Sequence, residues 1–116
     1  MSKEDYIKYV AEHFPITVEE FKKIQQEQFE IFCKKQFDYG PGNISLGSDL
    51  NKKEDRFASI SAIVVRLNDK IQRLINLVLK KQTLQGAANE PVMDAFRDAA
   101  VYCIIAEIVY NHKWAK

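Results

Sequence analysis

The chain has 116 residues, a length that predicts a single domain over residues 1–116. Its net charge of +1 produces no large electrostatic field, which excludes the usual basic protein that binds long nucleic acids. The apolar runs are too short to cross a bilayer and the N-terminus has no signal-type run, so we expect no membrane partner and a cytoplasmic location. Cys33 and Cys103 lie in apolar helical patterns and are expected to be buried thiols in a reducing compartment.

Two helices are predicted in the first third of the chain. A short helix runs from Ser2, a good capping residue, to about His13, within a segment 1–15 that is expected to be peripheral. The residues FPIT then interrupt it. A second helix begins at Thr17, which starts a capping box, and ends at about Phe37.

A loop and two longer helices follow. Residues 38–50 are rich in Gly, Pro, Asn, Asp and Ser, which favour turns. A third helix is predicted from between residues 49 and 55 to about Gln82, and a fourth over residues 89–111 with Pro91 in its first turn. No segment alternates with a period of two. The predicted fold is therefore all-α, with a short N-terminal helix and three long helices packed as a bundle.

The third predicted helix carries two rows of side chains along its length. The apolar stripe advances by alternating steps of four and three residues and is expected to face the core; it consists of Ile60, Val64, Leu67, Ile71, Leu74 and Val78. The charged strip shares another face and consists of Arg66, Asp69, Lys70 and Arg73. This strip is either a solvated face with internal ion pairs or the border of a cleft.

The fourth predicted helix carries an acidic row, Glu90, Asp94 and Asp98, which continues into Tyr102. Like charges four residues apart on a helix repel each other, so something should offset the repulsion. Asp98 lies near the start of an apolar segment, and a buried carboxylate needs a cation, a metal ion or hydrogen-bond donors. Two alternatives follow: ion pairs with the charged strip, or Mg²⁺ held together with a substrate's phosphates.

The glycine loop, DYGPGN at residues 38–43, has more special residues than a simple turn needs. Gly40 and Gly42 permit a positive φ and close approach of a ligand. Tyr39 can stack on a base, and Asp38 and Asn43 can bind a base edge or a sugar. The alternative is that the two polar side chains only cap the turn.

The segments FDYGPGNIS, ISAIVVRLNDKIQRLINLV, NEPVMDAFRDAAVYCIIAEIV and HKWAK resemble a small helical family common in bacteriophages, the nucleotide modification associated domain, type one. The resemblance covers about residues 28–116. The family's three motifs fall on Asp38, Tyr39 and Gly40; on Arg66, Asp69, Lys70, Arg73 and Leu74; and on Asn89, Glu90, Pro91, Asp94, Asp98 and Tyr102. Asn89 replaces an Asp of the family pattern and Pro91 replaces a Ser.

The resemblance implies a relation to the all-α nucleoside triphosphate pyrophosphohydrolases, which bind Mg²⁺ through acidic pairs on two neighbouring helices. It implies that a nucleotide is bound by Asp38, Tyr39, Gly40, Asn43, Arg66, Asp69, Lys70, Arg73 and Tyr102, and a metal ion by Asp69, Glu90, Asp94 and Asp98. The Glu-Glu-x-x-Glu motif of those enzymes is missing, since the third helix offers only Asp69. No catalytic residue is assigned, and turnover stays open.

Three functions are carried forward. The first is a phage-type protein of nucleotide metabolism or modification, with Mg²⁺-dependent pyrophosphate hydrolysis as its possible reaction, in a bacterium or an infected host cell. The second is a non-catalytic protein that senses or sequesters a nucleotide, such as a signalling nucleotide of bacterial defence. The third is a helical interaction module. The long helices are apolar round more of their circumference than one small bundle covers, so a homo-oligomer, a dimer or higher, is also expected.

Overall fold

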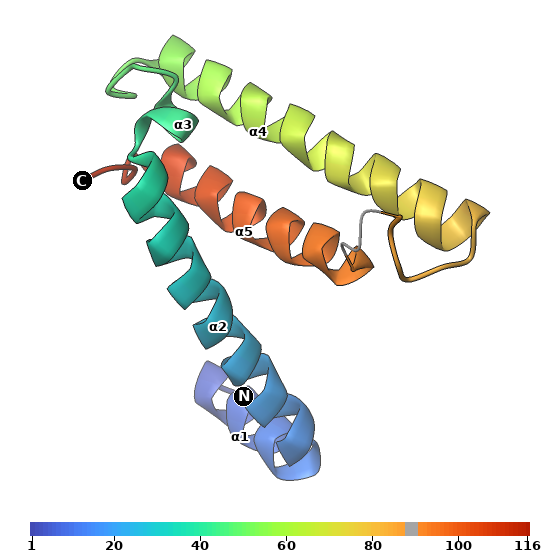
Figure 1. Cartoon of the computed structure of the whole chain (residues 1–116). Helices are drawn as coiled ribbons and strands as arrows, with labels where there is room; N and C mark the ends of the chain where they lie inside the picture. Colours follow the sequence, from blue (N-terminus) through green and yellow to red (C-terminus); the bar gives the residue numbers. More distant parts are fainter. Residues whose placement is uncertain (88–90) are drawn as a thin grey trace. The chain divides into compact units, whose positions relative to one another are not determined.

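The computed structural model describes residues 1–87 and 91–116, and this part of the chain is helical, as predicted (Figure 1). Within these residues no strand forms; Gln85 and Pro91 make an isolated bridge. The chain divides into two compact units, Met1–Lys35 and Gln36–Lys116, which are called the first and second unit. No helix in the described part is long and apolar enough to span a membrane.

The first unit contains α1 (Lys3–His13) and most of α2 (Pro15–Tyr39). The predicted start of α1 is confirmed, because Ser2 and Asp5 form a reciprocal capping box. The predicted start of α2 at Thr17 is wrong by two residues. Helix α2 begins at Pro15, whose fixed φ suits the first helical position, where its missing N–H costs nothing.

The second unit contains the last turn of α2, then α3 (Gly42–Ser45), α4 (Lys53–Leu74), the π-helix η1 (Ile75–Lys80) and α5 (Val92–Tyr110). Figure 1 shows α4 and α5 running side by side in opposite directions, with α3 beside the start of α4. The main axis of the unit is therefore a helical hairpin, and α3 and the C-terminal segment pack at one end of it.

Three predicted boundaries of this unit need correction. The interval 38–50 is not all loop, because α2 continues to Tyr39 and α3 forms inside it. The third predicted helix changes to i→i+5 hydrogen bonding after Leu74. Pro91 is not in the first turn of α5 but precedes it in an extended conformation. The predicted cap Asn89 lies outside the described residues.

The hydrophobic core of the described residues lies in the second unit. It consists of Ile44, Leu50, Ile63, Val92, Ala95, Ile105, Val109 and Trp114. On α4 the buried positions are Ser59 and Ile63, whereas Val64 and Ile71 of the apolar stripe are 57% and 46% exposed. The prediction that the whole stripe faces the core is therefore wrong. Helix α5 packs beside the stripe and leaves its outer edge uncovered.

Both cysteines are exposed, so the prediction of buried thiols is also wrong. Cys103 is two residues from the buried Ile105, which places it on the side of α5 turned away from the core. Cys33 lies on α2 in the first unit, where neither helix has a buried side chain. An apolar helical pattern gave the correct secondary structure here but not the correct burial.

The buried hydroxyl of Ser59 gives a stability prediction with a matched control. Its Oγ donates to the Ile44 carbonyl at 2.6 Å, linking α4 to α3. We expect Ser59→Ala to lower the free energy of unfolding by about 1–2 kcal/mol, because the carbonyl then loses a buried partner. Ser61→Ala removes an exposed hydroxyl that bonds only to its own helix, at the Phe57 carbonyl, and should cost less than about 0.5 kcal/mol. Urea denaturation of both variants measures the difference; equal costs would contradict the assignment.

Candidate functional site

The charged strip of α4 meets the acidic row of α5 at one ion pair. Lys70 Nζ lies 3.1 Å from Asp98 Oδ2, and each of the two side chains is 32% exposed. Of the two alternatives that the sequence left open for Asp98, the structure contains the interhelical ion pair. This pair is half-buried, so its two charges are less screened by water than those of a fully exposed pair.

Arg66 lies one turn before Lys70 on α4 and joins two other parts of the unit. Its Nη2 donates to the Asn43 carbonyl at 2.8 Å, and its guanidinium carbon lies 5.7 Å from the centre of the Tyr102 ring on α5. A guanidinium at this distance from an aromatic ring is attracted to the ring's electron density. Arg66 therefore links the glycine loop to α5, and Tyr102 lies next to the charged strip.

The glycine loop and the residue after it are held through backbone carbonyls. The carbonyls of Gly40, Pro41, Asn43 and Ile44 accept hydrogen bonds from the side chains of Gln36, Trp114, Arg66 and Ser59, respectively. Gly40 has a φ of +69°, which a side chain would strain. Gly42 starts α3 and has no positive φ. The special residues of the loop thus shape a backbone that three separate segments fix in place.

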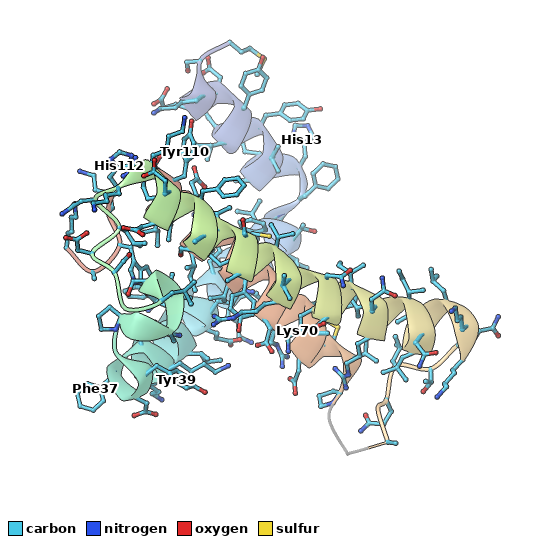
Figure 2. All side chains as sticks on the ribbon, turned by 90° about the horizontal axis from the view of Figure 1, so that it is seen from above. His13, Phe37, Tyr39, Lys70, Tyr110 and His112 are labelled. Carbon is cyan, nitrogen blue, oxygen red and sulfur yellow. The ribbon has the colours of Figure 1, made fainter. Side chains whose placement is uncertain are left out.

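Two predicted ligand-binding side chains of this region, Asp38 and Tyr39, are exposed. Tyr39 is 69% exposed and Phe37 is 89% exposed. Figure 2 shows both aromatic side chains near the end of α2, apart from Lys70. The side-chain oxygen of Asn43 is 3.3 Å from Gln36 Nε2, which makes it part of the loop's own hydrogen bonding. The loop and the charged strip are connected through the Asn43 backbone.

The predicted metal ligands have separate surroundings. Asp98 pairs with Lys70, Asp94 Oδ1 lies 3.3 Å from Arg97 Nη1, and Asp69 is exposed on α4. Glu90 lies outside the described residues. Among the described residues, no three acidic, histidine or cysteine side chains gather closely enough to hold a metal ion. In the structure, the Asp94 and Asp98 carboxylates of α5 each have a cationic side chain as a partner.

Sequence reasoning missed three residues that organise the site. Gln36, Ser59 and Trp114 bind carbonyls at the glycine loop, and Ser59 and Trp114 are buried. Trp114 also borders a cleft of about 310 Å³; of the residues that line it, none belongs to the predicted nucleotide or metal site. No local signal marks these roles, because each depends on a partner in another part of the fold.

No protein-family model, no curated protein and no solved structure matches the chain.

Proposed function

We propose that this protein binds a nucleotide or a nucleotide-derived anion at the charged strip of α4, with Lys70 as the main phosphate contact. The observation that carries the proposal is the Lys70–Asp98 pair beside Arg66 and Tyr102. Lys70 is fixed at a helix interface yet still reachable from solvent, and a phosphate could replace the Asp98 carboxylate as its partner. Arg66 and Arg73 on the same strip would add positive charge next to that phosphate.

The resemblance to the phage family favours the same substrate class and extends the proposal to nucleotide metabolism or modification. Binding without turnover is the reading that the geometry supports best, because the described carboxylates pair with cations. A protein of this kind would sense or sequester its nucleotide. A fold relation to the all-α pyrophosphohydrolases is part of the same proposal.

Magnesium-dependent hydrolysis is the second candidate function. The observation in its favour is that Asp94 and Asp98 lie one turn apart on α5, both partly accessible. A metal ion there would have to displace Lys70 and Arg97 from these carboxylates. When bound, Mg²⁺ would polarise a phosphoryl oxygen and present a water molecule.

The test is a thermal-shift screen of the full chain with mono-, di-, tri- and cyclic nucleotides, with and without Mg²⁺. A ligand that binds the folded chain raises its melting temperature, and the rise grows with ligand concentration. A concentration-dependent shift therefore supports binding. Release of pyrophosphate or monophosphate from standard or modified triphosphates would establish the second candidate. If neither a shift nor a product is observed with any nucleotide, both nucleotide functions are contradicted and the helical interaction module is the remaining hypothesis.

Tyr39 gives a prediction that separates base recognition from phosphate recognition. We expect Tyr39→Ala to weaken nucleotide binding by about fivefold or more, since stacking on one base contributes about 1–3 kcal/mol. Binding of inorganic pyrophosphate should be unchanged, because Lys70 is untouched, and stability should change by less than about 0.5 kcal/mol at this exposed position. Calorimetric titration measures both ligands.

Phe37→Ala is the matched control, since Phe37 is a second exposed aromatic at the end of α2 and is not a predicted ligand. It should leave both affinities as they are. If Tyr39→Ala and the unaltered protein bind the nucleotide with equal affinity, the glycine loop has a structural role only and does not contact the ligand.

A further inference from the structure

A cleft of about 310 Å³ in the second unit lies outside the proposed nucleotide site. It is lined from three segments: residues 41–45, which include α3, the connection 46–52 between α3 and α4, and the C-terminal residues 114–116. All three segments belong to the second unit. The volume is at the lower end of the range for small-molecule sites, so the cleft suits a ligand with one small ring.

The lining of this cleft includes a buried hydroxyl. Ser45, the last residue of α3, is 7% exposed. Its backbone N–H and carbonyl are both hydrogen-bonded, but among the described residues its Oγ has no hydrogen-bond partner. Every fully enclosed side-chain N or O atom in this part of the chain has a partner, so the Ser45 Oγ is not enclosed and opens into the cleft. A ligand there would supply the partner that a buried hydroxyl normally has.

The connection between α3 and α4 gives the cleft a wall of fixed shape. Ser48 Oγ accepts from the Leu50 N–H at 3.2 Å, and Asp49 Oδ1 accepts from the Asn51 N–H at 3.0 Å. Arg56 Nη1 on α4 donates to the carbonyls of Leu50 and Asn51 at 3.0 and 2.8 Å. A ligand would therefore meet a wall that is already ordered, which lowers the entropic cost of binding.

The polar groups of the cleft suit the hydroxyl groups of an uncharged ligand. The charged residues of the lining are Asp49 and Lys116, whose charges balance each other. The Ser48 hydroxyl can still donate a hydrogen bond, and the second carboxylate oxygen of Asp49 can still accept one. Together with Ser45 they offer donors and acceptors side by side, and a ligand hydroxyl can use both because it donates and accepts.

The rest of the lining is apolar and consists of Pro41, Trp114 and Ala115. Apolar walls with a few polar groups are the usual composition of a small-molecule site. A sugar ring matches this composition, since it has hydroxyl groups at its edge and C–H groups on its faces. We propose that the cleft binds a neutral sugar ring, either as a free monosaccharide or as the sugar of a nucleoside. This site is separate from the phosphate site at Lys70 and does not depend on it.

The experiment follows the indole N–H signal of Trp114 by two-dimensional NMR of the full, ¹⁵N-labelled chain. The chain has one tryptophan, so this signal reports on the cleft without ambiguity. Ribose, glucose, uridine and uracil are titrated separately. We expect a saturable shift with a dissociation constant on the order of 1 mM, as is usual for a ligand of this size. Saturation by ribose or glucose indicates a free sugar, whereas saturation by uridine alone indicates a nucleoside.

Three variants test the contacts. Ser45→Ala should weaken binding about tenfold, because it removes the hydroxyl that the ligand satisfies. Its melting temperature should change by less than about 2 °C, since that hydroxyl has no partner in the protein. Asp49→Asn, at an exposed position, should weaken binding about fivefold and retain an oxygen for the Asn51 N–H. Ser61→Ala is the matched control, because it removes an exposed hydroxyl outside the cleft and should leave the affinity unchanged.

The other outcomes overturn the proposal. If ribose, glucose and uridine all fail to give a saturable shift, the cleft binds no sugar ring. A shift by uracil equal to that by uridine would show that the base is recognised and the sugar is not. A shift that persists unchanged in both Ser45→Ala and Asp49→Asn would place the ligand elsewhere. A melting temperature of Ser45→Ala as low as that of Ser59→Ala would show that the Ser45 hydroxyl is structural.

Discussion

Replacing Trp114 by alanine is expected to lower the free energy of unfolding by about 3–5 kcal/mol, the largest single effect we predict. Trp114 is buried although it lies close to the C-terminal end of the sequence, and its Nε1–H donates to the Pro41 carbonyl at 3.1 Å. The alanine variant would lose both the packing of the indole and the hydrogen bond that fixes the glycine loop. Chemical denaturation followed by circular dichroism measures the loss.

Trp114→Phe separates the two contributions. Phenylalanine keeps most of the apolar packing but cannot donate to the Pro41 carbonyl, so we expect a cost of about 1–3 kcal/mol. Tyr110→Ala is the control, because Tyr110 is a large aromatic at the end of α5 that is 73% exposed. Its removal should cost less than about 0.5 kcal/mol. Similar losses for Trp114→Ala and Tyr110→Ala would show that the C-terminal segment does not stabilise the fold.

The dependence on Trp114 illustrates what local sequence patterns can and cannot supply. Helical periodicity and caps predicted α1, α2, α5 and the start of α4 to within a few residues, because these signals are local. The role of Trp114 depends on a carbonyl far away in the sequence, and no spacing rule reports such a contact. The same holds for Ser59 and its bond to Ile44.

The burial of α4 shows a second limit of sequence patterns. The apolar stripe correctly indicated an amphipathic helix, but the position of the stripe does not say which neighbour covers it. Here Arg66 and Lys70 contact side chains of α5, whereas Val64 is 57% exposed. Long charged side chains can pack their aliphatic stems at an interface while their charged ends bind partners. From residue type alone, Val64 would have been placed against α5, and Arg66 and Lys70 in solvent.

The site was predicted in part for the same reason. The i, i+3, i+4 and i+7 spacing correctly placed the charged strip on one face, and the step of four placed Asp98 and Tyr102 on a common face of α5. Which acid meets which cation depends on the axial register of the two helices. The structure selects Lys70 for Asp98 and Arg66 for Tyr102.

The two proposed functions predict opposite effects of the substitution Asp98→Asn on nucleotide binding. If Lys70 contacts phosphate, the Asp98 carboxylate competes with the ligand, and Asp98→Asn should tighten nucleotide binding by about fivefold, an electrostatic gain of about 1 kcal/mol. If Asp98 holds Mg²⁺, the same substitution should abolish Mg²⁺-dependent binding and turnover, since an amide is a poorer ligand for this ion. Calorimetric titration with and without Mg²⁺ distinguishes the two.

Two further variants make this result interpretable. Lys70→Met should weaken binding at least tenfold, because it removes the main cation. Asp94→Asn should change binding little, since Asp94 pairs with Arg97 on its own helix.

Asp98→Asn should also lower the free energy of unfolding by up to about 1 kcal/mol, the usual range for a partly exposed ion pair. Binding by Asp98→Asn should weaken as salt is added, because the contact is between charges. Weaker binding in both Asp98→Asn and Asp94→Asn would favour a metal site on α5 over a phosphate site at Lys70.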